Sequence, residues 1–347
     1  MARRYTDNPD AFTKYVKSLR RVQRGTRGEF EEAIAAAEQA IVEDMKQRAV
    51  EQSPPVPGGA LPGHPGTPAK DPGFALAYAS LARLYTSQSY LGYLPADDAH
   101  TKAKAAADFA LQMDSSLSGA RAALAFVSFF YEWDWQGADR QFREVLRQAP
   151  DDDETRRDHA WYLMAMGRPE EALREMEKAS QLNPQSEPHF AALAEMSFWA
   201  GRDDEALRHA GRARAIDPES AGATLVTACV QSRQGRHAEA IASYLDYLSQ
   251  ADKESLTSPT LAWFYATAGR REEALELMND AAPGEISPVQ MAWISAALGD
   301  KDTAFTWLEK ALAQRASGLT WIRTIPWFDP LRSDPRFQSI LVRMKLG

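Results

Sequence analysis

The sequence contains little cysteine, no long apolar run and no excess of positive charge. Cys229 is the only cysteine among 347 residues, so an intramolecular disulfide and a cysteine-based zinc site are both excluded. No stretch approaches the roughly 18 apolar residues of a membrane-spanning helix. The first residues are not followed by the apolar segment of a secretory signal. These absences favour a soluble, cytoplasmic protein that does not bind a membrane.

The balance of charge is acidic. The chain has 48 Asp and Glu against 40 Lys and Arg, which gives a formal net charge of −8. Binding to the phosphate backbone of nucleic acid requires a basic surface, so this balance argues against a nucleic-acid partner. One segment departs from it, because six cations and no acid lie between residues 14 and 27. If this segment is helical, one face is either solvated or a basic docking face for an acidic partner. That face carries Lys17, Arg20, Arg21 and Arg24.

Motifs that carry common enzyme chemistry are also missing. The six histidines include no pair spaced four residues apart, and there is no His-Glu-x-x-His. The sequence has neither a phosphate-binding glycine loop nor a Gly-x-Ser-x-Gly elbow. The acidic runs at residues 151–154 and 170–171 are typical of helix amino termini, where carboxylates complement the helix dipole. We therefore expect no catalytic residue, no metal and no cofactor.

The sequence does contain a regular internal repeat. The phrase Gly-Arg-x-x-Glu-Ala followed by Leu or Ile begins at Gly167, Gly201, Gly235 and Gly269, at three equal intervals of 34. A variant of the phrase begins at Gly299, after a slightly shorter interval. Equal intervals of this length are typical of arrays in which each unit buries its apolar face against its neighbours.

Each unit is predicted to consist of two amphipathic helices. Apolar residues recur at three- and four-residue spacing on both sides of each glycine. The glycine supplies the left-handed residue that ends the first helix, and a proline near the end of the unit stops the second. Small residues are expected where the first helix approaches its partner closely. These are Ala160, Ala194, Ala228, Ala262 and Ala292.

This pattern resembles the tetratricopeptide repeat, and the resemblance covers nearly the whole chain. It implies an all-α fold, a right-handed α-solenoid of about eight helix pairs with a C-terminal capping helix. We place an N-terminal pair at 1–51, the array at 74–313 and the cap at 314–347, where it covers an apolar face formed by Trp307, Leu308 and Ala311. After an earlier unit near Ala75, units are expected to begin near Ser118, Asp153, Glu187, Ala221, Ser255 and Glu285.

Three phrases narrow the resemblance further. They are Tyr131-Glu-Trp-Asp-Trp-Gln-Gly-Ala, His159-Ala-Trp-Tyr-Leu and Phe328-Asp-Pro-Leu-Arg-Ser-Asp-Pro-Arg-Phe. They are similar to phrases in the C-terminal repeat arrays of bacterial signalling and transcription regulators, where the array follows a winged-helix, cyclase or protein-kinase domain. No such domain lies within these 347 residues. The chain is therefore either a stand-alone sensor array or a piece of a longer protein.

A segment rich in proline and glycine interrupts the repeats. Residues 52–73 hold seven of the 20 prolines and five of the 20 glycines, a composition that opposes both helix and strand. We interpret it as an inserted loop, with a proline-rich ligand for an aromatic groove as the alternative.

The resemblance also implies a binding site. In the family, set positions of each first helix line a concave groove, and here many of those positions are aromatic. Aromatic rings favour an apolar or proline-containing peptide, because they bury a large area at little cost in side-chain entropy. The family's carboxylate clamp, which needs Lys and Asn, does not fit these residues. The groove positions are Arg83, Phe126, Phe129, Phe130, Arg157, Trp161, Met164, Glu195, Phe198, Trp199, Cys229, Arg233, Trp263 and Trp293.

Three functions remain open at this point. The first is a non-enzymatic scaffold that binds a peptide or a partner protein in the groove. The second is the regulatory module of a signalling protein whose effector domain lies elsewhere. The third is an enzyme or carrier that holds an apolar small molecule in the concavity.

Overall fold

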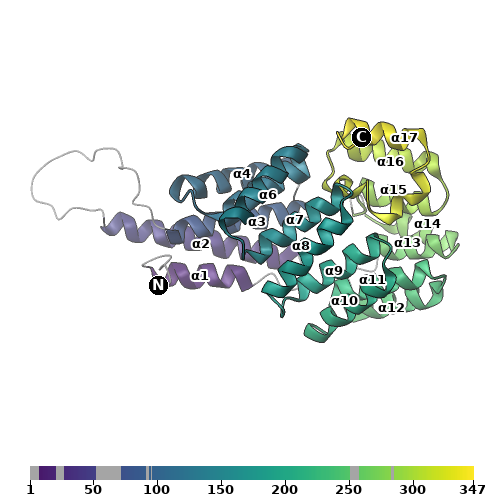
Figure 1. Ribbon diagram of the computed structural model, residues 1–347, viewed down its shortest axis with the longest axis horizontal. Helices are drawn as coiled ribbons and strands as arrows, with labels where there is room; N and C mark the ends of the chain where they lie inside the picture. Colours follow the sequence, from purple (N-terminus) through teal and green to yellow (C-terminus); the bar gives the residue numbers. More distant parts are fainter. Residues whose placement is uncertain are drawn as a thin grey trace, which may run out of the picture. The chain divides into compact units, whose positions relative to one another are not determined.

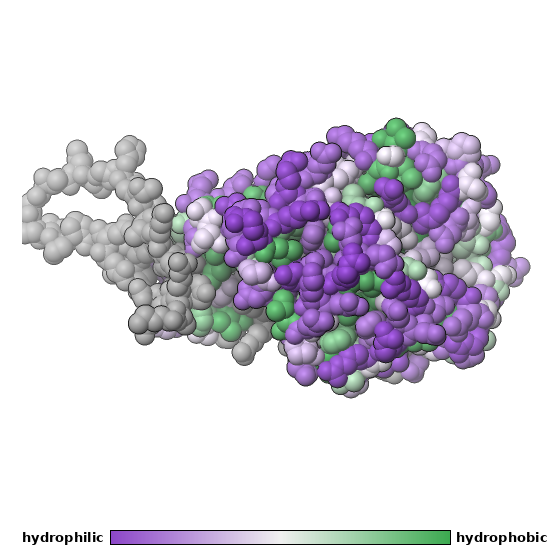
Figure 2. Space-filling model, viewed as in Figure 1, coloured by the Kyte–Doolittle hydropathy of each residue, from purple (hydrophilic) through white to green (hydrophobic). Residues whose placement is uncertain are grey.

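The computed structural model describes residues 8–20, 27–51, 72–90, 94, 96–250, 258–282 and 285–347. All regular structure in these residues is helical, which confirms the predicted all-α class. The chain divides into two compact units, one ending at Pro150 and the other beginning at Asp151. The described surface in view is mainly hydrophilic, with scattered hydrophobic residues (Figure 2).

The first unit contains three helix pairs. Each helix packs on the next along the chain, as the repeat predicts, and a core of small and aliphatic side chains such as Ala37, Leu81 and Ala107 joins the pairs. The elements are α1 (Pro9–Arg20), α2 (Arg27–Glu51), α3 (Pro72–Tyr90), α4 (Ala96–Met113), α5 (Ser118–Val127), the π-helical turn η1 (Ser128–Glu132) and α6 (Trp135–Gln148).

The second unit contains five pairs and a C-terminal region (Figure 1). The pairs are α7 (Asp153–Ala165) with α8 (Pro169–Leu182), α9 (Glu187–Trp199) with α10 (Asp203–Ile216), α11 (Ala221–Arg233) with α12 (His237–Gln250), α13 (Pro259–Thr267) with α14 (Arg271–Asp280), and α15 (Pro288–Ala297) with α16 (Lys301–Ala313). The C-terminal region contains the 3-10 helices η3 (Ser317–Trp321) and η4 (Pro326–Leu331), followed by α17 (Pro335–Arg343).

The predicted unit starts agree with the helix starts where the spacing of the repeat is regular. Helices α5, α7, α9 and α11 begin at the predicted residues, whereas α13 and α15 begin at Pro259 and Pro288, later than expected. Proline is well suited to the first turn of a helix, since its missing N–H would have no partner there. For the same reason α3 begins at Pro72, inside the predicted insertion. Residues 52–71 of that insertion lie outside the described residues.

The repeated glycines end the first helices as predicted. Each of the five has a positive φ, from 72° at Gly167 to 80° at Gly299. After each glycine, the next backbone N–H reaches back across the turn, as when Arg202 donates to the carbonyl of Ser197 at 2.9 Å. This Schellman arrangement satisfies carbonyls that the end of a helix would otherwise leave unpaired.

The predicted small residues lie in the packed interior between the helices. All five alanines predicted for the first helices are completely buried. The alanines of the repeated phrase are buried to the same extent. These are Ala172, Ala206, Ala240, Ala274 and Ala304.

The last helix, α17, packs on α16. Its apolar residues Phe337, Ile340 and Leu341 are buried. At one end the Arg336 guanidinium lies over the ring of Phe305, with 4.1 Å to the centroid, and at the other Arg343 forms an ion pair with Glu309 at 2.7 Å.

We predict opposite effects of two glycine substitutions. Gly235→Ala places a side chain at φ 78° and is expected to lower the free energy of unfolding by about 1 kcal/mol. Gly211→Ala, inside α10, is expected to raise it by about 0.5–1 kcal/mol. A new Cβ has open space at both positions, so urea unfolding of the two variants isolates the backbone effect.

We also predict that deletion of residues 325–347 causes aggregation. The deletion exposes the buried apolar residues of α16, including Leu308 and Ala311, and an exposed apolar face of this kind promotes association. Size-exclusion chromatography with light scattering measures the result. A monodisperse truncated chain would show that this region does not cap the array.

Candidate functional site

The first helices of unit 2 present a row of equivalent residues. Trp161, Glu195, Cys229 and Trp263 are separated by the full interval of the repeat, so they occupy the same repeat position on α7, α9, α11 and α13. Trp293 follows on α15, after the same shorter interval that separates Gly269 from Gly299. We call the surface that these positions form the inner face of unit 2. It is the surface that the resemblance assigns to partner binding.

The chain's own C-terminal segment, defined here as residues 317–331, lies against this inner face. The indole of Trp321 contacts those of Trp161 and Trp199, with ring centroids 5.2 Å and 5.6 Å apart, and the latter two are 5.4 Å from each other. All three pairs meet edge to face, the arrangement that aromatic quadrupoles favour. A further contact lies beside this cluster, because a Cβ at Gly167 would be 3.2 Å from Nε of Arg323.

A second indole of the segment contacts the other end of the row. The ring of Trp327 lies 5.7 Å from that of Trp263 and 3.8 Å from that of Trp293. Trp321 and Trp327 therefore cover the aromatic ends of the row, and residues 322–326 connect them. Between these two aromatic ends, the residues of the row are Glu195 and Cys229.

The segment is held in shape by bonds within the C-terminal region. Arg332 donates to the carbonyls of Arg323 at 2.6 Å and Ile325 at 2.9 Å, and Arg323 donates to the carbonyl of Leu346 at 3.3 Å. Ile322, Ile325 and the η4 residues Phe328 and Leu331 are buried. The segment thus combines local hydrogen bonds with apolar contacts to the repeats.

The middle of the row is polar but poorly solvated. Burial raises the pKa of the Glu195 carboxyl to about 7, although part of the residue remains accessible. None of the described residues gives this carboxylate a hydrogen bond or a salt bridge. Burial, together with the neighbouring Glu195, also raises the pKa of the Cys229 thiol well above its usual range. Burial therefore shifts both groups toward their neutral forms.

Arg233 connects α11 to the preceding repeat. It donates to the carbonyl of Phe198 at 2.9 Å, lies over that residue's ring at 4.0 Å, and forms an ion pair with Asp203. Asp329 of the C-terminal segment exerts an electrostatic attraction on the same guanidinium. This side chain is therefore committed to contacts within unit 2.

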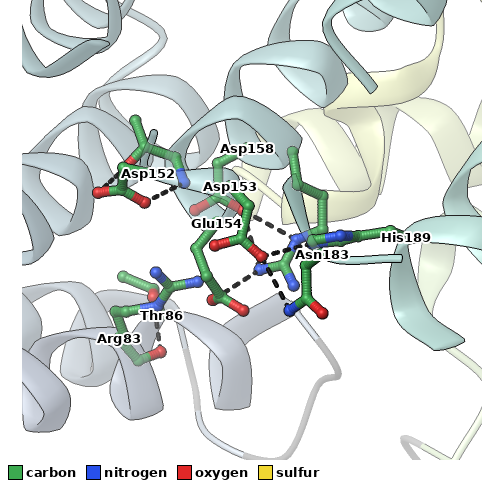
Figure 3. A network of polar contacts seen from close by, with 10 residues as sticks. Arg83, Thr86, Asp152, Asp153, Glu154, Asp158, Asn183 and His189 are labelled. Atoms are coloured by element: carbon green, nitrogen blue, oxygen red, sulfur yellow. Dashed lines mark hydrogen bonds and ion pairs between the residues drawn. The ribbon is translucent and has the colours of Figure 1, made fainter. Parts of the chain in front are cut away.

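A polar network surrounds the start of α7 (Figure 3). Asp152 accepts a hydrogen bond from the backbone N–H of Thr155 at 2.9 Å and so caps the helix. Arg157, predicted for the groove, forms ion pairs with Glu154 and with Asp158, the latter at 3.1 Å. The completely buried His189 lies 3.6 Å from Asp153, and burial and Arg157 lower its pKa. These contacts position α7 and α9 beside each other.

Several predicted groove residues contribute to packing. Met164, Phe198 and Cys229 in unit 2 are at most 3% exposed, and Trp293 is 9% exposed. In unit 1, Phe129 and Phe130 are buried in contact with each other and with the half-buried Phe126. Arg83 lies on α3 in the same unit. The buried rings offer a partner little surface, because the predicted positions turn toward the helices on either side.

The sequence prediction missed Trp321 and Trp327. We assigned residues 314–347 to a cap and gave neither indole a role. Two tryptophans outside the repeats, in a segment that also holds Leu319, Ile322 and Ile325, were the available signal.

Other predictions fall on residues that the structure describes only in part. Lys17 and Arg20 of the basic docking face lie on α1, and Arg21 and Arg24 lie outside the described residues. No group of three or more potential ligands that could hold a metal occurs in the described part of the chain. Over the same residues, no helix is both long enough and apolar enough to cross a membrane.

Comparison with known families decides the nature of the repeats. The tetratricopeptide repeat family matches residues 130–197, from η1 to α9. Residues 130–197 carry tetratricopeptide repeats. No curated protein matches it.

Several solved structures of repeat proteins are similar. Yeast Tom70 is 13% identical, with 99% of this chain and 69% of that chain covered and a TM-score of 0.53. PilF of Pseudomonas aeruginosa is 18% identical over 77% of this chain and 99% of its own, with a TM-score of 0.42. A tetratricopeptide repeat protein of Parabacteroides merdae is 13% identical over 97% of this chain and 100% of its own, with a TM-score of 0.38. At these identities the likeness to Tom70 concerns the fold alone.

We predict that Glu195→Gln changes the pH dependence of stability. The pKa of Glu195 is raised in the folded state, so its contribution is complete below the unfolded value near 4.5 and is lost as pH rises through about 7. Glutamine does not ionise. Each pKa unit corresponds to about 1.4 kcal/mol, and partial exposure reduces the effect, so we expect the variant to gain about 1–3 kcal/mol at pH 8 and little at pH 4.

Urea unfolding at a series of pH values checks this prediction. Glu276→Gln, at an exposed position on α14, is the matched control. A gain that does not change between pH 4 and pH 8 would contradict the burial of the Glu195 charge.

Proposed function

We propose that this protein is a non-enzymatic interaction scaffold whose inner face in unit 2 binds an apolar, proline-containing segment of a partner protein. Tetratricopeptide repeats belong to the helical arrays whose extended inner surfaces bind other molecules. The proposal places that general role on the row from Trp161 to Trp293.

One observation carries the proposal. The chain's own η4, which begins at Pro326, packs on α15, and the Trp327 ring contacts the rings of Trp263 and Trp293. A surface that accommodates an apolar segment with a proline in this chain is suited to a segment of the same chemistry from another chain. Indoles at both ends supply the large, rigid contact area that dominates the affinity of protein interfaces.

The chemistry of the middle of the row supports binding rather than catalysis. A nucleophilic cysteine acts as its thiolate, whereas the surroundings of Cys229 raise the pKa of its thiol. Its thiol is also buried at 2% exposure of the residue. These two features disfavour attack on a substrate.

A double substitution on the inner face tests the proposal. Wild-type protein and the Trp161→Ala, Trp263→Ala variant are used as bait in a native lysate, and captured proteins are identified by mass spectrometry. We expect at least one partner to lose ten-fold or more of its yield with the variant, because each end of the row loses one of its rings. Trp307→Ala, on the second helix α16 of its repeat, is the matched tryptophan control and should retain the partner.

Circular dichroism establishes that each bait is folded. A partner set that is the same for the wild type and the inner-face variant would contradict the proposal.

A further inference from the structure

The C-terminal segment covers the aromatic residues at the two ends of the inner face but, within the described residues, gives its polar groups no hydrogen-bond or ion-pair partner. The indole Nε1 of Trp293 is buried and has no hydrogen-bond partner among the described residues, and the same is true of Trp327. A buried donor left without a partner loses the hydrogen bond that it would make to water and so destabilises the contact. A segment that offers a hydrogen-bond acceptor to the Trp293 indole would therefore bind this position more favourably than Trp327 does.

The carboxylate of Glu195 is the second polar group without a partner among the described residues. The buried side chains between the two indoles of the segment are those of Ile322 and Ile325, which are apolar. Arg323 is exposed, and its guanidinium donates to the carbonyl of Leu346. The one cation between the two indoles is therefore engaged elsewhere, and no ion pair within the described residues joins the segment to Glu195, although a partly buried carboxylate is strongly stabilised by a cation.

The charged groups on the surrounding elements do not replace that cation. On α7, Arg157 is paired with Glu154 and Asp158. On α11, Arg233 is bound to Asp203 and to the carbonyl of Phe198, and Cys229 is neutral. In the C-terminal segment Asp329 carries a negative charge that attracts Arg233. An incoming lysine or arginine would meet Glu195 without a competing cation of the inner face.

The segment is held by local bonds of its own backbone and by buried apolar side chains, which include Leu319, Ile322 and Phe328. Its described backbone hydrogen bonds are local, such as those from Ile325 to Trp321 at 2.9 Å and from Ile322 to Leu319 at 2.9 Å. Its contacts with the inner face include ring contacts that another aromatic segment could reproduce. Displacement would therefore exchange these aromatic contacts for others and would expose the backbone amides of the segment to solvent.

We propose that the inner face of unit 2 is a receptor for a partner segment with two aromatic side chains six residues apart and a lysine or arginine between them, and that residues 317–331 are a resident occupant which this partner displaces. The spacing is that of Trp321 and Trp327. The inference rests on the proposed function and specifies the partner's chemistry. Because the resident is tethered, its effective concentration is on the order of millimolar, so it competes with every ligand of this face.

Two fluorescein-labelled peptides test the proposal by fluorescence anisotropy. One has the sequence of residues 316–332, and the other carries Ile325→Lys within that sequence. The receptor is the full chain with Trp321→Ala and Trp327→Ala, which removes the two resident indoles. At pH 8 we expect the lysine peptide to bind at least ten-fold more tightly than the unsubstituted one. The wild-type chain, whose resident competes, should bind both at least ten-fold more weakly than the variant does.

Glu195→Gln in the same receptor separates a charge pair from a general effect of lysine. The advantage of the lysine peptide should fall to less than two-fold in this background, and it should also decrease at pH 5.5, where Glu195 is mainly protonated. An equal affinity for the two peptides, or an advantage that survives Glu195→Gln, would overturn the cation requirement.

Hydrogen exchange on the unsubstituted chain provides a measurement that does not depend on the double variant being folded. Saturating lysine peptide should increase exchange at amides in residues 317–331 and leave exchange in α12 unchanged. Protection that persists at saturation would overturn displacement of the resident. If the lysate experiment still shows a partner that depends on Trp161 and Trp263 while neither peptide binds, the two-aromatic motif is wrong and the proposed scaffold function stands.

Discussion

The close approach of neighbouring helices at fully buried alanines is the constraint on which the rest of the structure depends. With only a methyl group at these positions, the two helices of a repeat pack at a short distance, and the same geometry recurs from one repeat to the next. Regular stacking is what brings position 161 into line with 195, 229 and 263. The inner face is therefore a product of the alanine rows, and larger side chains there would disturb it by overpacking.

The C-terminal region of unit 2 combines two roles that a simple cap does not have. Helix α17 packs on the last repeat, whereas residues 317–331 extend along the first helices as far as α7. The aromatic residues of the inner face are consequently covered by the same chain. Whether an array of this kind is open or occupied depends on its terminal segment as much as on its repeats.

The repeat and much of the fold could be predicted from the sequence, because both follow from local signals. Glycine at equal intervals, such as Gly201 and Gly235, and proline at helix starts determine where helices begin and end. The occupied inner face could not be predicted in this way. The contact between Trp161 and Trp321 joins residues far apart in the chain, and no periodicity relates the non-repetitive C-terminal segment to a particular helix. The burial of Phe129 and Phe130 likewise depends on the π-helical turn at Ser128–Glu132, which the repeat pattern does not specify.

The contact of Trp321 with α7 also changes how unit 2 is expected to fold and unfold. An open repeat array has nearest-neighbour contacts alone, so it frays from its ends and folds by local propagation. Here the first and last parts of the unit are joined, which raises the contact order and makes loss of either end disturb the other. Unit 2 should accordingly unfold as one cooperative block rather than repeat by repeat, and its final folding step must wait until the chain's last residues are present.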